Sequence, residues 1–196
     1  ACVNALSTKL VARVFRDGKV YRQEYSQGIP TMDMKIDGAS DFPEQHGTEI
    51  TFWPDGSIMQ VVDFDFEKIA LRLKQQAYLT RSLTITLDDR RKNEKRKYFF
   101  ENGIKSYVSQ LVIGRKPLFD DVFYFEKDVN DIVVEVSLSY TEAFQDSVFT
   151  FANNIYTADG GMHMVGFRTA LTRVINAFAR KQELLKEKDE NLTGDD

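Results

Sequence analysis

The chain has 196 residues, of which 42% are hydrophobic and 29% charged, and its formal net charge is −4. This composition predicts a globular protein with a sizeable core and excludes a mostly disordered chain. The net charge does not indicate nucleic-acid binding by the whole chain, although a local basic patch stays open. No apolar run approaches the roughly 18 residues of a membrane span and no leader pattern opens the chain, so we expect a soluble, cytoplasmic protein with no membrane partner.

Cysteine and histidine are too scarce for the common metal sites. Cys2 is the single cysteine, which excludes an internal disulfide and fits a reducing compartment. His46 and His163 lie far apart in sequence, and a zinc site needs more nitrogen or sulfur ligands than two. We therefore predict no metal ligand in this chain and expect Cys2 to be a small buried residue.

The first predicted element is a hairpin. Residues 9–16 and 19–25 alternate between apolar and polar, and Asp17-Gly18 between them favours a two-residue turn. The segment 26–45 is rich in glycine and proline, which predicts turns and one short strand near residues 34–36.

The stretch "GTEITFWPD" predicts a further strand that ends at Pro54-Asp55-Gly56. Side chains two residues apart in a strand share a face. Thr48 and Ile50 are therefore expected on one face together with Phe52.

A helix follows over "FDFEKIALRLKQQAYL", with Asp63 as its expected N-cap. A strand "SLTITLDD" then leads to the run "RRKNEKRK", in which six of eight residues are basic. Such a run could contact phosphate, but between two strands it is more typical of a solvated hairpin tip.

Asn102-Gly103 breaks the pattern, and we place a domain boundary near it, giving domains 1–100 and 101–196. A helix is expected over 104–111, followed by the strand-like runs "DVFYFEKD", "DIVVEVSLSY" and "SVFTFANNI". The final helix is "MHMVGFRTALTRVINAFARK", with an apolar stripe at helical spacing. The stripe comprises Met164, Phe167, Leu171, Val174, Ile175 and Phe178. The segment "KQELLKEKDE" after it is a solvated helix end or linker.

These patterns alone give an α+β protein without a complete catalytic motif. The chain has no P-loop, no G-x-S-x-G elbow, no H-E-x-x-H and no dinucleotide fingerprint. A non-enzymatic α+β binding module is one interpretation of that absence.

Four strings carry a resemblance to a known family. "VNALS", "RDGKVYRQEYSQG", "GTEITFWPD" and "GGMHMVGFRTALTRVINAFARK" with "NLTGDD" stand in the order found in the B subunits of bacterial type II topoisomerases, DNA gyrase and topoisomerase IV. Each string is weak alone, but four in one order are specific, and they span essentially the whole chain. A mismatch-repair clamp, a related ATPase, is an alternative that lacks "GTEITFWPD" together with "NLTGDD".

The resemblance implies a fold and a function. Residues 1–100 resemble the C-terminal half of a Bergerat-type (GHKL) ATPase sandwich, and residues 101–196 resemble the start of a transducer domain of the ribosomal-protein-like left-handed βαβ type. Members of the family use ATP and Mg²⁺ to close a dimeric clamp on double-stranded DNA. They form a heterotetramer with a DNA-cleaving A-type subunit, and coumarin-type inhibitors bind the ATP pocket.

The resemblance also implies that key residues lie outside this chain. The family's catalytic Glu, magnesium-binding Asn and adenine-reading Asp would precede Ala1, and its Gln-Thr-Lys loop would follow Asp196. We therefore expect a longer protein at both ends and no catalytic residue in this segment. Met162 stands where relatives have Thr in Gly-Gly-Thr-His, which leaves the role of that helix start open.

Nucleotide-binding residues carry over at two places. Ala1 and Cys2 match the start of the helix after the family's phosphate-binding lid, where free N–H groups favour phosphate; a helix start that only packs is the alternative. Thr48 matches the threonine that hydrogen-bonds adenine with a shared water, and Ile50 matches an apolar residue of the pocket floor.

Two arginines complete the expected site. Arg16 matches an arginine at the pocket rim that contacts coumarin-type inhibitors, with a solvent-facing strand end as the alternative. Arg168 lies at the edge of the apolar stripe of the last helix and is our candidate for lining the DNA cavity. A surface arginine in a salt bridge is the alternative for Arg168.

Overall fold

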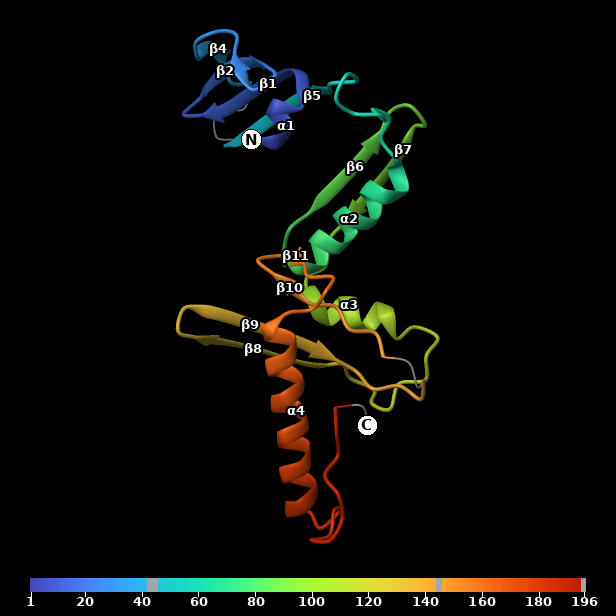
Figure 1. The fold of residues 1–196 in the computed structure, drawn as a ribbon. Coiled ribbons are helices and arrows are strands. Elements are labelled where there is room, and N and C mark those ends of the chain that lie inside the picture. Colours follow the sequence, from blue (N-terminus) through green and yellow to red (C-terminus); the bar gives the residue numbers. More distant parts are fainter. Residues whose placement is uncertain (42–45, 144–145, 195–196) are drawn as a thin grey trace. The chain divides into compact units, whose positions relative to one another are not determined.

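The structure is a computed structural model that describes residues 1–41, 46–143 and 146–194. The chain divides into two compact units, Ala1–Asp65 and Phe66–Asp196 (Figure 1). The boundary predicted near residue 100 falls inside the second unit and stays a prediction.

The first unit is an antiparallel sheet with one short helix. Its strands are hydrogen-bonded in the order β3-β2-β1-β5, and β4 also pairs with β2. The elements are α1 (Cys2–Ala5), β1 (Ser7–Arg16), β2 (Lys19–Ser26), β3 (Ile29–Pro30), β4 (Lys35–Ala39) and β5 (Gly47–Pro54). Leu10, Val11 and Val20 are its buried apolar side chains.

The hairpin predicted at Asp17-Gly18 is confirmed. Arg16 pairs with Lys19, so the loop has two residues, and Asp17 and Gly18 have φ of 52° and 69°. Two positive φ values are what a type I′ turn requires, and its twist matches that of the flanking strands. The turn thereby fixes the register of β1 against β2.

In its described residues, the second unit combines three two-stranded hairpins with three helices. α2 packs against the β6–β7 hairpin, and α3 packs against α2 and β9 (Figure 1). The elements are α2 (Phe66–Leu79), β6 (Ile85–Asp89), β7 (Glu94–Tyr98), α3 (Gly103–Leu111), β8 (Phe123–Val129), β9 (Ile132–Leu138), β10 (Phe151–Ala152), β11 (Ile155–Tyr156) and α4 (Met162–Lys181).

Aromatic stacking forms the centre of the second unit. Tyr78 is 2% exposed, and its ring centroid lies 3.6 Å from that of Phe100 and 4.9 Å from that of Tyr107. Phe149 continues this line against Tyr107, with centroids 5.6 Å apart. The stack joins α2 and α3 to the segment after β7, which carries Phe100, and to the segment before β10, which carries Phe149. The apolar face of a single helix could not connect all four.

Two predictions about the second unit are wrong. α2 begins at Phe66, so Asp63 is too far upstream to be its N-cap. The run "SVFTFANNI" is not one strand, because Asn153 and Asn154 have φ of 48° and 63° and turn the chain into the β10–β11 hairpin. Asparagine tolerates this left-handed conformation better than most residues.

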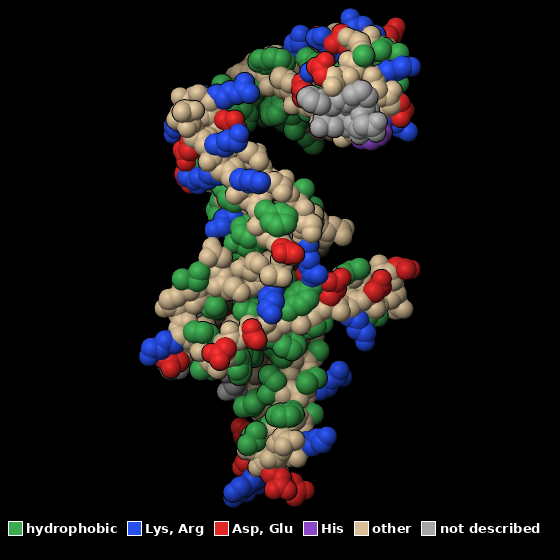
Figure 2. Space-filling view, turned by 180° about the vertical axis from the view of Figure 1, so that it is seen from behind, with side chains coloured by type: hydrophobic (Ala, Val, Ile, Leu, Met, Phe, Trp, Pro, Cys, Tyr) green, Lys and Arg blue, Asp and Glu red, His purple; other side chains and the backbone are tan. Residues whose placement is uncertain are grey.

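The apolar stripe of α4 is only partly covered. Val174 and Phe178 are 60% and 58% exposed, whereas Asn176 and Ala179 are buried. Figure 2 shows apolar side chains reaching the surface of the second unit. The helical period correctly predicted that these residues form a helix. The side of α4 that packs against other described residues is partly polar, because it includes Asn176.

Candidate functional site

The strand register brings three expected site residues to one face of the first unit's sheet. Thr48 pairs with Val14, and Ile50 pairs with Ala12. Directly opposed residues of antiparallel strands point to the same side, and Arg16 lies two residues beyond Val14. We call this side, which carries Thr48, Ile50 and Arg16, the Thr48 face.

The Thr48 face is open and mostly apolar. Thr48 is exposed, and Ile50 is 51% exposed. Phe52 continues the row, and its ring meets that of Phe64 edge-on at 6.1 Å. A hydroxyl beside apolar side chains on a pleated surface offers a flat ring one polar contact and an apolar floor.

The charged groups of β5 lie on the other side. Glu49 pairs with Arg13 across the strands, with Arg13 Nη1 3.3 Å from Glu49 Oε2. Arg16 is in contact with Asp17, with Nε 3.4 Å from Oδ2, and its side chain is 71% exposed. Arg16 therefore projects into solvent at the rim of the Thr48 face, which also fits the alternative of a solvent-facing strand end.

The helix expected at Ala1 and Cys2 is present, but it is a single turn. Ala1 O accepts from Ala5 N–H at 3.1 Å, and no side chain caps the start. The expectation of a buried Cys2 is wrong, because the thiol is exposed. α1 ends beside Pro54, at the opposite end of β5 from Thr48, so the two expected nucleotide contacts are not adjacent.

Asp55, whose role the sequence did not reveal, anchors the end of β5. It is 4% exposed, and its carboxylate accepts from Ser57 N–H and Oγ at 2.9 and 2.6 Å and from Gln27 Nε2 at 2.9 Å. The hydroxyl of Ser57, then Gln27 and the Ser57 amide, lower the pKa of Asp55. An Asp two residues before Ser is the signal for this Asx-type turn.

The basic run forms the tip and second strand of the β6–β7 hairpin, and two of its arginines pair with carboxylates. Arg91 donates to Asp89, with Nη2 2.7 Å from Oδ2, and this contact lowers the pKa of Asp89 to about 2. Arg96 donates to Glu67 at 2.6 Å and to Glu94 at 2.8 Å. These pairs favour the solvated hairpin over the phosphate site.

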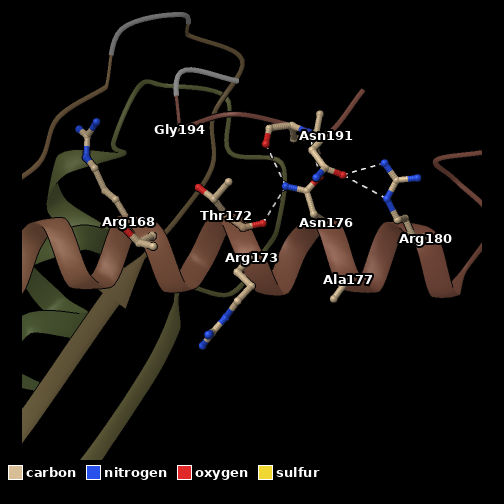
Figure 3. Close-up of a pocket in the computed structure, with 10 residues that line it drawn as sticks. Arg168, Thr172, Arg173, Asn176, Ala177, Arg180, Asn191 and Gly194 are labelled. Atoms are coloured by element: carbon tan, nitrogen blue, oxygen red, sulfur yellow. Dashed lines mark hydrogen bonds between the residues drawn. The ribbon is translucent and has the colours of Figure 1, made fainter. Parts of the chain in front are cut away.

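A pocket of about 640 Å³ lies between α4 and the segment 191–194 (Figure 3). We call it the α4 cleft. Arg168 and Arg173 line it, and Figure 3 shows their side chains pointing in different directions. Arg168 Nη2 donates to Asp146 Oδ2 at 2.9 Å, and both side chains are exposed. The structure thus contains the salt bridge that was the alternative interpretation of Arg168. An exposed ion pair of this kind is weak, so another anion can replace Asp146 as the partner of Arg168.

Asn176 fixes the far wall of the α4 cleft. Its Nδ2 donates to Leu192 O at 2.9 Å, and its Oδ1 accepts from Leu192 N–H at 2.8 Å. Arg180 adds bonds to Asn191 Oδ1 at 2.7 Å and to Asp189 O at 2.9 Å. Part of the "NLTGDD" string is thus docked on α4 by hydrogen bonds; residues 195–196 lie outside the described residues.

Within the described residues, no helix has the length and apolarity to cross a membrane. The same residues contain no group of three His, Cys, Asp or Glu side chains arranged to hold a metal ion.

Comparison with known sequences identifies close relatives. A model of the DNA gyrase B family matches residues 103–196. The DNA gyrase B protein of Enterococcus faecalis is 47% identical over 99% of this chain, and the DNA topoisomerase 4 B protein of Streptococcus pneumoniae is 42% identical over 99% of it. The chain spans 30% of the length of each of these two relatives.

Solved structures of related proteins share the fold. The 43K ATPase domain of Thermus thermophilus gyrase B, determined with an aminocoumarin, superposes with a TM-score of 0.84 at 34% identity. This superposition covers 98% of this chain and 52% of that one. The topoisomerase IV ATP-binding domain of Francisella tularensis, in complex with a small-molecule inhibitor, gives 0.79 at 27% identity, covering 95% and 50%. The α+β fold class expected from the sequence is thereby confirmed.

Proposed function

We propose that this chain is part of the ATP-operated clamp of a bacterial type II topoisomerase, because it belongs to the family of the B subunits of these enzymes. The complete protein binds and hydrolyses ATP in the cytoplasm to drive dimerisation, capture of double-stranded DNA and strand passage, as supercoiling or decatenation. Its further partners are a second copy of itself and a DNA-cleaving A-type subunit. Family membership sets aside the mismatch-repair clamp and the non-enzymatic binding module.

The Thr48 face is the observation that carries this proposal. Thr48 and Ile50 share one open side of the sheet with Arg16 at its rim. That arrangement suits adenine, since Thr48 supplies a hydroxyl and Ile50 an apolar surface. Arg16 would contact coumarin-type inhibitors, in keeping with the aminocoumarin bound to the Thermus relative.

Ala1 and Cys2 are proposed to face the nucleotide phosphates. Exposed N–H groups at the start of α1 would donate to them. The described residues contain no group of three candidate Mg²⁺ ligands. As the resemblance implies, the family's magnesium-binding Asn and catalytic Glu are proposed to lie in other parts of the complete protein.

Arg168 is proposed to line the DNA cavity of the transducer domain. Its side chain is 41% exposed at the α4 cleft, and its guanidinium pairs with an exposed carboxylate, Asp146. A DNA phosphate could replace Asp146 as its partner, since both are anionic oxygen acceptors. Under this proposal residues 1–100 belong to the ATPase domain and 101–196 to the transducer.

The nucleotide assignment is tested with Thr48→Val in the complete protein. One hydroxyl contact contributes about 0.5 to 1.5 kcal/mol, so the Kd for ATP should rise by roughly 2- to 10-fold. Thr51→Val is the matched control, because Thr51 lies on the same strand but on the opposite face. Equal ATP affinity in the wild type and in Thr48→Val, measured by calorimetry, would return Thr48 to a structural role.

The DNA assignment is tested with Arg168→Gln in the same protein. ATP affinity should be unchanged, while DNA-stimulated turnover and strand passage fall. Arg173→Gln is the control, since Figure 3 shows Arg173 pointing elsewhere on α4. A loss of ATP affinity with intact DNA stimulation would contradict the assignment.

A further inference from the structure

A closed polar network connects the end of α2 to the β8–β9 hairpin. Arg81 Nη2 donates to Glu135 Oε1 at 2.6 Å and lies 3.0 Å from Glu126 Oε2. Its guanidinium carbon also lies 4.8 Å from the ring centroid of Tyr124. The Tyr124 hydroxyl is 2.9 Å from an oxygen of each of the same two carboxylates. In this set of four residues, which we call the Arg81 network, Arg81 and Tyr124 therefore each contact both carboxylates.

The negative charges of the two carboxylates are partly neutralised by Arg81. Glu126 and Glu135 are directly opposed across β8 and β9. Like charges in directly opposed positions of a hairpin repel each other, which destabilises the pairing. Arg81 supplies the cation from outside the hairpin, so it neutralises a repulsion that β8 and β9 create between themselves.

The start of α3 leaves room for Arg81. Gly103 has φ of +52°, and a Cβ at that position would lie 2.8 Å from Arg81 Cγ and 3.2 Å from Arg81 Nε. The neighbouring residue adds a further contact, because Asn154 Nδ2 donates to Thr80 Oγ1 at 3.3 Å. Thr80 and Arg81 thus contact α3, the β8–β9 hairpin and the β10–β11 turn.

We propose that Arg81 is a positioning residue that couples nucleotide-driven movement of the ATPase domain to the transducer. The proposal rests on the proposed function and on its domain assignment, in which Arg81 belongs to the ATPase domain and Glu126 and Glu135 to the transducer. When α2 moves, the guanidinium moves with it relative to the two carboxylates. The hairpin then loses its neutralising cation, and its preferred position changes.

The test uses the complete protein in assembly with its A-type partner, with ATP turnover measured with and without linear DNA. Arg81→Gln should leave turnover without DNA within about twofold of the wild type and lower DNA stimulation by about 5-fold, which corresponds to about 1 kcal/mol of coupling. Arg72→Gln is the control, because it also removes one positive charge, but from the body of α2, where Arg72 contacts Gln75 of its own helix at 3.2 Å.

A charge reversal separates positioning from a general loss of structure. Arg81→Glu should lower DNA stimulation further, and adding Glu135→Arg should restore part of it, since the pair is re-formed with opposite polarity. Unchanged stimulation in Arg81→Gln, or no recovery in the double variant, would overturn the coupling role. Failure of the wild-type assembly to turn over ATP would instead refute the proposed function, so the two failures are distinguishable.

Discussion

The hydroxyl of Tyr78 is a buried polar group whose removal should stabilise the protein. Tyr78 is 2% exposed, and its hydroxyl has no hydrogen-bond partner among the described residues. Burial, and next the neighbouring Tyr107, raise the pKa of Tyr78. The ring itself is held by stacking on Phe100 and Tyr107, and a phenylalanine would keep that stacking.

The expected size follows from the cost of an unpaired hydroxyl. Burying such a group without a partner costs about 1 to 2 kcal/mol in proteins. Tyr78→Phe should therefore raise the free energy of local opening by about that amount. Amide hydrogen exchange in α2 and α3 would then slow by a factor of about 5 to 30.

Tyr107→Phe is the matched control for this prediction. Burial raises the pKa of Tyr107, but a side-chain hydrogen bond with Gln75 opposes the rise. Removing that hydroxyl should leave exchange unchanged or make it faster, because a satisfied group is lost. If Tyr78→Phe also speeded exchange, the hydroxyl would have a partner after all and the reasoning would be refuted.

Two further predictions concern the α4 cleft and the basic hairpin. Asn176→Ala leaves the backbone of Leu192 without its side-chain partner, so hydrogen exchange at the Leu192 amide should be faster by about 10-fold. Unchanged exchange at this amide would show that residues 191–194 are held by other contacts. Asp89 should titrate at about 2 rather than 3.8 in an NMR titration, because Arg91 stabilises its charged form. Since this pKa is lowered in the folded state, the stabilisation is present above pH 3.8 and is lost as the pH falls through about 2. A measured value near 3.8, or no rise in Arg91→Gln, would contradict it.

Local turn chemistry made much of the fold predictable. Asp17-Gly18 gave the β1–β2 hairpin, because few dipeptides adopt two positive φ values readily. Asn153-Asn154 carries the same signal, yet it lies between runs so short that alternation masked the turn. Asn130 and Asp131 likewise have φ of 53° and 62° and close the β8–β9 hairpin. The two strands of this hairpin were predicted correctly as separate runs.

The candidate site was predictable only in part. Alternation placed Thr48 and Ile50 on one face, and the register adds Arg16 to it. Periodicity could not show that Asn176 would be a buried position of α4, because its burial depends on a segment that docks through hydrogen bonds. The exposure of Cys2 also escaped prediction, since residue type alone does not reveal which side chains pack against a residue.

The pairing of β1 with β5 also makes the proposed ligand contact sensitive to insertions and deletions. Ser7 pairs with Pro54 and Lys9 with Trp53, so Thr8 is an extra residue that the bulge accommodates at one end of the strand pair. A length change near Thr8 can be absorbed there. One between Ala12 and the turn cannot, because a slip of one position would move Val14 and Arg16 from the Thr48 face to the other side of the sheet and remove the arginine from its rim. The tolerance of β1 to gaps should therefore differ sharply between its two halves.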